Sequence, residues 1–174
     1  SGGYVPPRRS IADGSVAYSK PSWGGTVYQE KYLPNAKMLV CPEARTYDYA
    51  DKILAATLTT GNAYYDWITY GMNRYYAAND IGGVPFRFSN TRHPSVTVLI
   101  GDSIDMTPDG TGSRRGQELL MYPVANITYL RPRFDIRHSD SANVGWSDGH
   151  VTSEKNAWLR LQNKLDTSGF NPTL

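Results

Sequence analysis

Residues 134–153 read FDIRHSDSANVGWSDGHVTS, and this stretch contains the clearest folding signals in the chain. In its middle, residues alternate so that Val144 and Trp146 lie on the same face of an extended strand. Asp148 and Gly149 follow, and this dipeptide indicates a hairpin turn because glycine adopts the positive φ that such turns require. The chain then returns in a second strand, so the sequence predicts a β-hairpin here.

His138 and Asp148 are separated by nine residues within this hairpin. A tight turn at residues 139–142 would bring the two side chains together. We interpret the pair as structural, with a His–Asp or His–backbone hydrogen bond that holds the hairpin. A metal site is the alternative, with Asp102 and Asp140 as additional ligands: oxygen ligands favour Ca²⁺, and histidine favours a transition metal.

Further elements are expected before and after the hairpin. Residues 96–100 are a continuous apolar, β-branched run, typical of a central strand, which we expect to end at residues 101–103 with Asp102 capping the next turn. Shorter strands are predicted at 64–70, 86–88 and 127–130. Helices are predicted at 26–33 (after a turn at 23–25), at 47–58 and at 154–164, where Ser153 is the N-cap. Residues 71–85 and 106–116 are predicted loops. Short strands with hairpin connections and short helices favour an α+β fold with a mainly antiparallel sheet.

The length and composition indicate one domain over residues 1–174, with an extended lead-in at 1–14 and a tail at 166–174. Hydrophobic residues make up 40%, and thirteen Tyr and four Trp add large apolar surfaces. The net charge of +2 gives no strong electrostatic basis for binding nucleic acid or an anionic membrane. No apolar run is long enough to span a bilayer, and we expect the chain to be a fragment without its signal sequence.

The spacing of His138 and the Asp148-Gly149 pair resembles the H-X9-DG segment of bacterial prepilin-like proteins, which are similar to type II secretion pseudopilins and type IV pilins. Three more stretches resemble the same proteins in the same order: 39–43 (LVCPE), 68–73 (ITYGMN) and 94–103 (PSVTVLIGDS). The resemblance therefore covers roughly residues 32–152.

This resemblance implies a pilin-like globular head whose long N-terminal helix is missing from the chain. In such proteins a leader is removed by a prepilin peptidase, and the helix anchors the subunit in the inner membrane and packs in the filament core. The implied function is that of a structural subunit and not an enzyme, without a cofactor, located in the cell envelope with a periplasmic or extracellular head. Its implied partners are other pilin-like subunits. Some secretion pseudopilins hold Ca²⁺ in a C-terminal loop, but the resemblance supplies no matching ligands here.

Cys41 is the one cysteine of the chain, so it cannot form an internal disulfide. Free cysteine is usually a small buried hydrophobe, and this is our interpretation of Cys41. The alternative is a disulfide to a second cysteine in the missing N-terminal region, because disulfides persist outside the cytoplasm.

Two functions of other classes stay open from the sequence. One is an extracellular carbohydrate-binding module, in which exposed aromatic side chains stack on sugar rings; the candidates are Tyr64, Tyr65, Trp67, Tyr70, Tyr75 and Tyr76. The other is a metal-dependent hydrolase built on His138, Asp148 and Asp102. Burial distinguishes the first from the structural interpretation, because aromatic side chains that form the core cannot bind a glycan. Metal removal tests the second, because an unchanged melting temperature of the metal-free protein would count against it.

Overall fold

The computed structural model describes residues 23–29, 31–48, 50–55, 68–73, 88–105, 114–116, 119–120, 133–155 and 157. The α-helices in these ranges are α1 (Trp23–Gln29) and α2 (Ala50–Ala55), and the 3₁₀ helices are η1 (Ala36–Leu39), η2 (Pro42–Ala44) and η4 (Phe88–Asn90). The strands are β1 (Tyr70–Asn73), β2 (Val98–Ile104), β3 (Leu119–Leu120), β4 (Arg133–Phe134), β5 (Ser141–Trp146) and β6 (Val151–Lys155). Of the helices described, none has the length and apolar character needed to cross a membrane.

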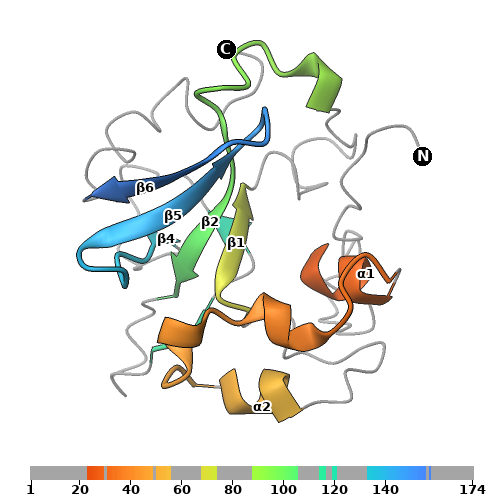
Figure 1. The fold of residues 1–174 in the computed structure, drawn as a ribbon, viewed down its shortest axis with the longest axis vertical. Coiled ribbons are helices and arrows are strands. Elements are labelled where there is room, and N and C mark those ends of the chain that lie inside the picture. The colour runs from red at the N-terminus through yellow and green to blue at the C-terminus, as the bar shows by residue number, and fades with distance from the viewer. Residues whose placement is uncertain are drawn as a thin grey trace, which may run out of the picture.

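One sheet joins these strands in the order β3-β1-β2-β5-β6, and β4 pairs with the end of β2. All pairings are antiparallel except the one between β1 and β3. Helices α1 and α2 lie on the β1 side of the sheet, and the β5–β6 hairpin forms the other side (Figure 1). The prediction of a mainly antiparallel sheet with few, short helices is confirmed.

Strand β2 is the centre of this sheet, as its apolar run predicts, but it begins at Val98 and not at the predicted residue 96, and it is longer than expected. It continues through Gly101 and Asp102 to Ile104, and Asp102 pairs with Tyr70 in β1. The prediction that the strand ends at residues 101–103, with Asp102 as a cap, is therefore wrong. The polar residues remain in the strand because side chains from other segments satisfy them. Gly101 is required there, since a Cβ at this position would lie 2.5 Å from Cε1 of Phe134.

The β5–β6 hairpin forms as predicted, with Val144 and Trp146 buried on one face. Its turn depends on Gly149, which has a φ of 95°. Strand β6 then continues to Lys155, and Ser153 pairs with Asn143. The prediction that Ser153 caps a helix starting at residue 154 is wrong there, because β5 supplies backbone partners that outweigh the helical periodicity. Residues 156 and 158–164 of that predicted helix lie outside the described residues.

The first helix also differs from its prediction. Helix α1 begins at Trp23, so residues 23–25 are helical and do not form the expected turn. Glycine at position 24 lets this helix pack closely against Ile68, because a Cβ there would lie 2.6 Å from Cδ1 of Ile68. Helix α2 lies within its predicted range, whereas residues 71–73 belong to β1 and not to a loop.

Several predicted segments fall outside the described residues. They are the lead-in at 1–14, the strand at 127–130, the tail at 166–174, and most of the strands at 64–70 and 86–88 and of the loops at 71–85 and 106–116.

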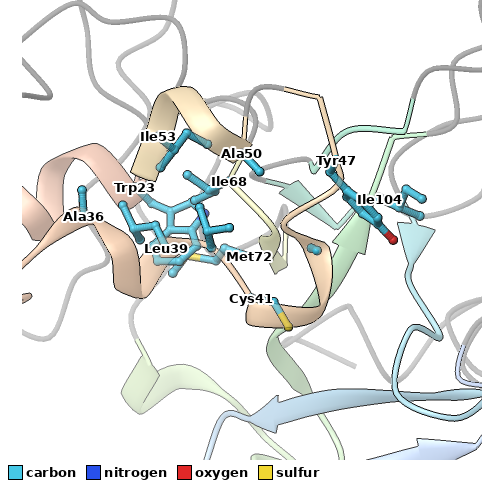
Figure 2. Close-up of a cluster of buried hydrophobic side chains, with 12 residues drawn as sticks. Trp23, Ala36, Leu39, Cys41, Tyr47, Ala50, Ile53, Ile68, Met72 and Ile104 are labelled. Atoms are coloured by element: carbon cyan, nitrogen blue, oxygen red, sulfur yellow. The ribbon is translucent and has the colours of Figure 1, made fainter. Parts of the chain in front are cut away.

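Two hydrophobic clusters pack against the sheet. The first takes side chains from α1, η1, α2, β1 and β2, and Cys41 is part of it with 2% of its surface exposed (Figure 2). Burial of Cys41 is thus confirmed. The second cluster contains Val98, Leu120, Phe134, Ala142, Val144, Trp146 and Ala157. Strand β2 contributes to both clusters, so it connects the helical side of the molecule to the hairpin.

Replacing Gly149 by alanine tests the hairpin turn. We expect Gly149→Ala to lower the free energy of unfolding by about 1–2 kcal/mol, the usual penalty for a Cβ in the left-handed region. No atom lies within 4 Å of the added Cβ, so steric clash contributes nothing. Gly149→Asn should cost less, because asparagine tolerates this conformation. Denaturant unfolding measures both variants, and an alanine variant as stable as the wild type would refute the role of this turn.

Candidate functional site

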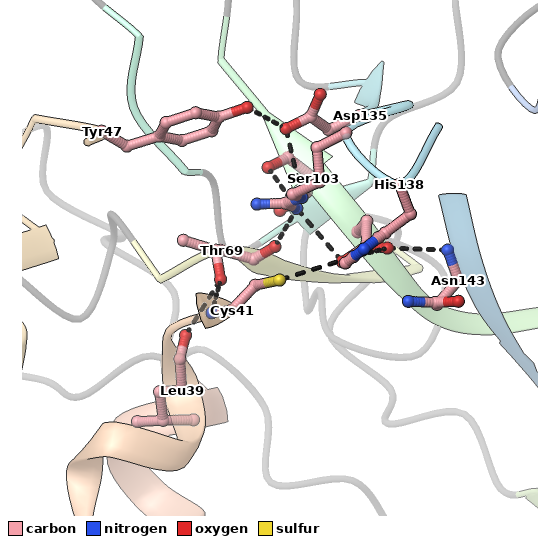
Figure 3. A network of polar contacts seen from close by, with 10 residues as sticks. Leu39, Cys41, Tyr47, Thr69, Ser103, Asp135, His138 and Asn143 are labelled. Atoms are coloured by element: carbon pink, nitrogen blue, oxygen red, sulfur yellow. Dashed lines mark hydrogen bonds and ion pairs between the residues drawn. The ribbon is translucent and has the colours of Figure 1, made fainter. Parts of the chain in front are cut away.

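Asp102 has a buried carboxylate that contacts polar groups from other segments. Figure 3 shows the polar network of this region, in which Cys41, His138 and Asn143 are labelled. Oδ1 of Asp102 lies 3.3 Å from Nη2 of Arg137, and its Oδ2 lies 3.3 Å from Nε2 of His138. The backbone N–H of Asn143 donates to Oδ2 at 2.7 Å. A carboxylate without solvent needs such partners, because an uncompensated buried charge is strongly destabilising.

Arg137 extends the network to further segments of the chain. Its side chain is 4% exposed, and Nη2 donates to the carbonyl oxygens of Thr69 at 2.7 Å and Ser103 at 3.3 Å. Its Nε lies 3.3 Å from Oδ2 of Asp135. The hydroxyl of Tyr47 donates to the same carboxylate, and the guanidinium carbon lies 5.5 Å from the centre of the Tyr47 ring. The planar, permanently charged guanidinium suits a position that must contact several acceptors and an aromatic face.

Cys41 joins the network from the helical side. Its Sγ lies 3.4 Å from Nε2 of His138, and its backbone N–H donates to Oγ1 of Thr69 at 2.6 Å. The N–H of Thr69 in turn donates to the carbonyl of Leu39 at 3.1 Å. We call the full set the Asp102 network; its members are Cys41, Tyr47, Thr69, Asp102, Ser103, Asp135, Arg137, His138 and Asn143.

The four stretches quoted for the family resemblance meet in this network. Residues 39–43 supply Cys41, residues 68–73 supply Thr69, residues 94–103 supply Asp102 and Ser103, and the H-X9-DG segment supplies His138 and Asn143. Asp135 and Arg137 precede that segment, and Tyr47 lies outside all four stretches. Segments that are far apart in the sequence are therefore joined through one set of buried polar contacts.

The structure does not bring His138 and Asp148 together. The expected tight turn does form: His138 and Ser141 exchange backbone hydrogen bonds of 3.0 and 3.1 Å around Ser139 and Asp140, which have positive φ values of 52° and 63°. That turn feeds β5, whose six residues extend roughly 20 Å. The nine-residue spacing thus separates the ends of one strand, and the expected His138–Asp148 contact is wrong.

Asp148 has its own partner at the far end of the hairpin. Its Oδ1 accepts from the backbone N–H of His150 at 3.1 Å and lies 2.5 Å from Nδ1 of the same residue. These hydrogen bonds lower the pKa of Asp148. The site that the hydrolase hypothesis requires is not formed, because His138 contacts Asp102 whereas Asp148 contacts His150. Asp140 is exposed in its turn.

Sequence reasoning missed the contact of Cys41 and Arg137 with this site. Cys41 and His138 are 97 positions apart, and no local spacing links them. The one available signal was indirect: both residues lie in stretches that share the same family resemblance.

Tyr70 is the one member of the predicted aromatic surface that the structure describes. It is partly buried, and burial raises its pKa, followed by the effects of the nearby Cys41 and Asp102. Tyr70 therefore faces the Asp102 network. Tyr64, Tyr65, Trp67, Tyr75 and Tyr76 lie outside the described residues.

The Cys41–His138–Asp102 arrangement differs from a nucleophilic triad. In a triad the histidine uses one ring nitrogen for the nucleophile and the other for the orienting carboxylate. Here Sγ and the carboxylate both lie next to the same nitrogen, Nε2. The geometry suits a shared cation or a static hydrogen-bond network better than proton relay.

Removing Arg137 tests the importance of the buried ion pair. We expect Arg137→Met to lower the free energy of unfolding by about 3–5 kcal/mol, because it leaves Asp102 uncompensated. The matched control is Arg45→Met at an exposed arginine, which should change stability by less than about 0.5 kcal/mol. The double variant D102N/R137M should lose less than the sum of the single changes. Equal effects at both arginines would contradict the role of the network.

The pKa values of Asp102 and Asp148 should be shifted in opposite directions. Burial raises the pKa of Asp102, although Arg137, the N–H of Asn143 and His138 oppose this. An NMR titration of the carboxyl carbons in buffer with a chelator should place Asp102 above the ordinary aspartate value of about 3.9 and Asp148 below it.

The consequences for stability follow from these directions. The folded-state pKa of Asp102 is the higher one, so its contribution is complete below about pH 3.9 and declines as the pH rises through the folded-state pKa. The contribution of Asp148 has the opposite sign: it is present above its ordinary pKa and is lost as the pH falls through the lowered one. An Asp102 carboxyl that titrates below the ordinary value would show that Arg137 outweighs burial.

Comparison with known proteins found no match to any protein-family model, curated protein or solved structure.

Proposed function

We propose that this chain is the globular head of a structural subunit, a pilin-like protein of a bacterial secretion pseudopilus or type IV pilus-like assembly, and not an enzyme. The observation that carries the proposal is the Asp102 network. The four stretches that resemble prepilin-like proteins contact one another through polar side chains and backbone groups inside the molecule. Such contacts support a role in holding the fold.

The H-X9-DG segment has a structural explanation under this proposal. His138 anchors the start of the hairpin on Asp102, and Gly149 closes its far turn. The nine residues between His138 and Asp148 are the length of β5 with its two turns. The spacing therefore corresponds to β5 together with its flanking turn residues. A constant spacing keeps the size and register of the hairpin constant from subunit to subunit.

Assembly follows the pattern of pilin-like proteins. The proposal requires that the gene product carries a leader and an apolar helix before Ser1, with the helix anchored in the inner membrane and packed in the filament core. The head then makes lateral contacts with neighbouring subunits outside the cytoplasm. Among the described residues, exposed apolar side chains are suited to such contacts; they are Tyr32, Met38, Val96 and Val151.

The proposal is tested with the full-length gene. Co-expression with a prepilin peptidase should shorten the protein by its leader, and intact-mass spectrometry measures this shift. An inactive peptidase is the matched control. When the other assembly components are present, the processed protein should enter the sheared filament fraction, whereas the isolated chain described here should stay monomeric. A product that the active peptidase never shortens would refute the proposal.

A further inference from the structure

Three metal-ligand atoms of different chemistry converge in the Asp102 network. Sγ of Cys41, a carboxylate oxygen of Asp102 and a ring nitrogen of His138 all lie within 4.8 Å of one another. Cys41 and Asp102 are buried, and His138 is partly exposed. We propose that these three residues bind one divalent transition-metal ion, with Zn²⁺ as the ion that fits best. This inference goes beyond the proposed structural role and does not depend on it.

The two distances from Nε2 of His138 to its co-ligand atoms are close to those around tetrahedral zinc. Typical bond lengths are about 2.3 Å to sulfur, 2.0–2.1 Å to nitrogen and 2.0–2.2 Å to oxygen. At tetrahedral angles these lengths put sulfur and nitrogen about 3.5–3.6 Å apart, and nitrogen and oxygen about 3.3–3.5 Å apart. The observed separations from Nε2 of His138 are 3.4 Å to Sγ of Cys41 and 3.3 Å to Oδ2 of Asp102.

The use of a single ring nitrogen also favours a metal. One N–H on Nε2 cannot point well at both the sulfur and the carboxylate. If Nε2 is instead a metal ligand, its lone pair points to the ion, the ring proton sits on Nδ1, and the other two atoms become co-ligands. The position of Sγ and of the carboxylate next to one ring nitrogen, which is poor for hydrogen bonding, suits the coordination of a metal ion.

A divalent ion would also balance the charges of the buried site. Asp102 and Asp135 carry two negative charges against the single positive charge of Arg137. A Cys41 thiolate adds another negative charge, and a divalent ion brings the sum to zero. The competing arrangement keeps the thiol protonated and balances Asp102 with a His138 imidazolium, and the experiment below distinguishes the two.

Neighbouring groups hold the ligands in place. The N–H of Asn143 fixes Oδ2 of Asp102 at 2.7 Å, and Arg137 holds Oδ1 at 3.3 Å. The N–H of Cys41 is bonded to Oγ1 of Thr69. Outer contacts of this kind orient metal ligands and tune their affinity. A mixed sulfur, nitrogen and oxygen set selects Zn²⁺ over the Ca²⁺ considered from the sequence, since Ca²⁺ takes oxygen ligands.

Binding of Zn²⁺ to metal-free protein tests the proposal. Calorimetric titration should give one ion per chain, together with a higher melting temperature, because a ligand of the native state stabilises it. Co²⁺ should give a thiolate-to-cobalt charge-transfer band. Cys41→Ser should abolish this band, and Cys41→Ser and His138→Gln should each weaken Zn²⁺ binding at least about 100-fold. Binding should also weaken as the pH falls, since protons compete for the thiolate.

The matched controls are His150→Gln and Asp148→Asn, which alter the exposed pair at the other end of the hairpin. Both should leave affinity and the cobalt band unchanged. If a ligand variant fails to fold, X-ray absorption at the zinc edge of the wild-type protein still decides, because the proposal requires one sulfur ligand. Absence of Zn²⁺ binding, a sulfur-free zinc shell, a His138 imidazolium in Zn²⁺-treated protein, or Cys41 in a disulfide in the full-length protein would each overturn the proposal.

Discussion

The buried ion pair of Arg137 and Asp102 is the constraint on which the rest of the structure depends. Neither charge can be left without partners inside the protein, and the guanidinium reaches the carbonyl groups of Thr69 and Ser103 as well as Asp135. Those acceptors belong to different segments, so all segments must be in place before the charges are satisfied. Hydrophobic burial alone tolerates small shifts between segments, whereas this set of contacts fixes their relative positions.

Strand β2 connects the ion pair to the sheet and to both hydrophobic clusters. It carries Asp102 in its middle, pairs with β1 on one side and β5 on the other, and contributes side chains to both hydrophobic clusters. Gly101 next to Asp102 leaves room for the ring of Phe134. A strand with buried polar residues at its centre is stable here because each is met by a neighbouring segment.

Cys41, Asp102 and His138 link segments of the fold and also carry side chains that could bind a ligand. Proximity of a thiol, an imidazole and a carboxylate is the usual starting point for catalysis, but here Sγ and the carboxylate share one ring nitrogen and Cys41 is almost fully buried. This geometry suits a bound ion that would join three of the four resembling stretches. A zinc ion and the Arg137 ion pair would then stabilise the fold in the same way, by linking segments through charge.

Features that depend on near neighbours could be predicted from the sequence: the alternation of Val144 and Trp146, the turn at Gly149 and the apolar run of β2. Turn geometry and alternation are local properties, so these predictions did not need the fold. Only the tertiary structure decided that β2 continues past Gly101, that Ser153 lies in a strand and not at a helix start, and that His138 meets Asp102 in place of Asp148. Each of these outcomes depends on a partner distant in the chain, whose backbone hydrogen bonds or charge outweigh the local preference.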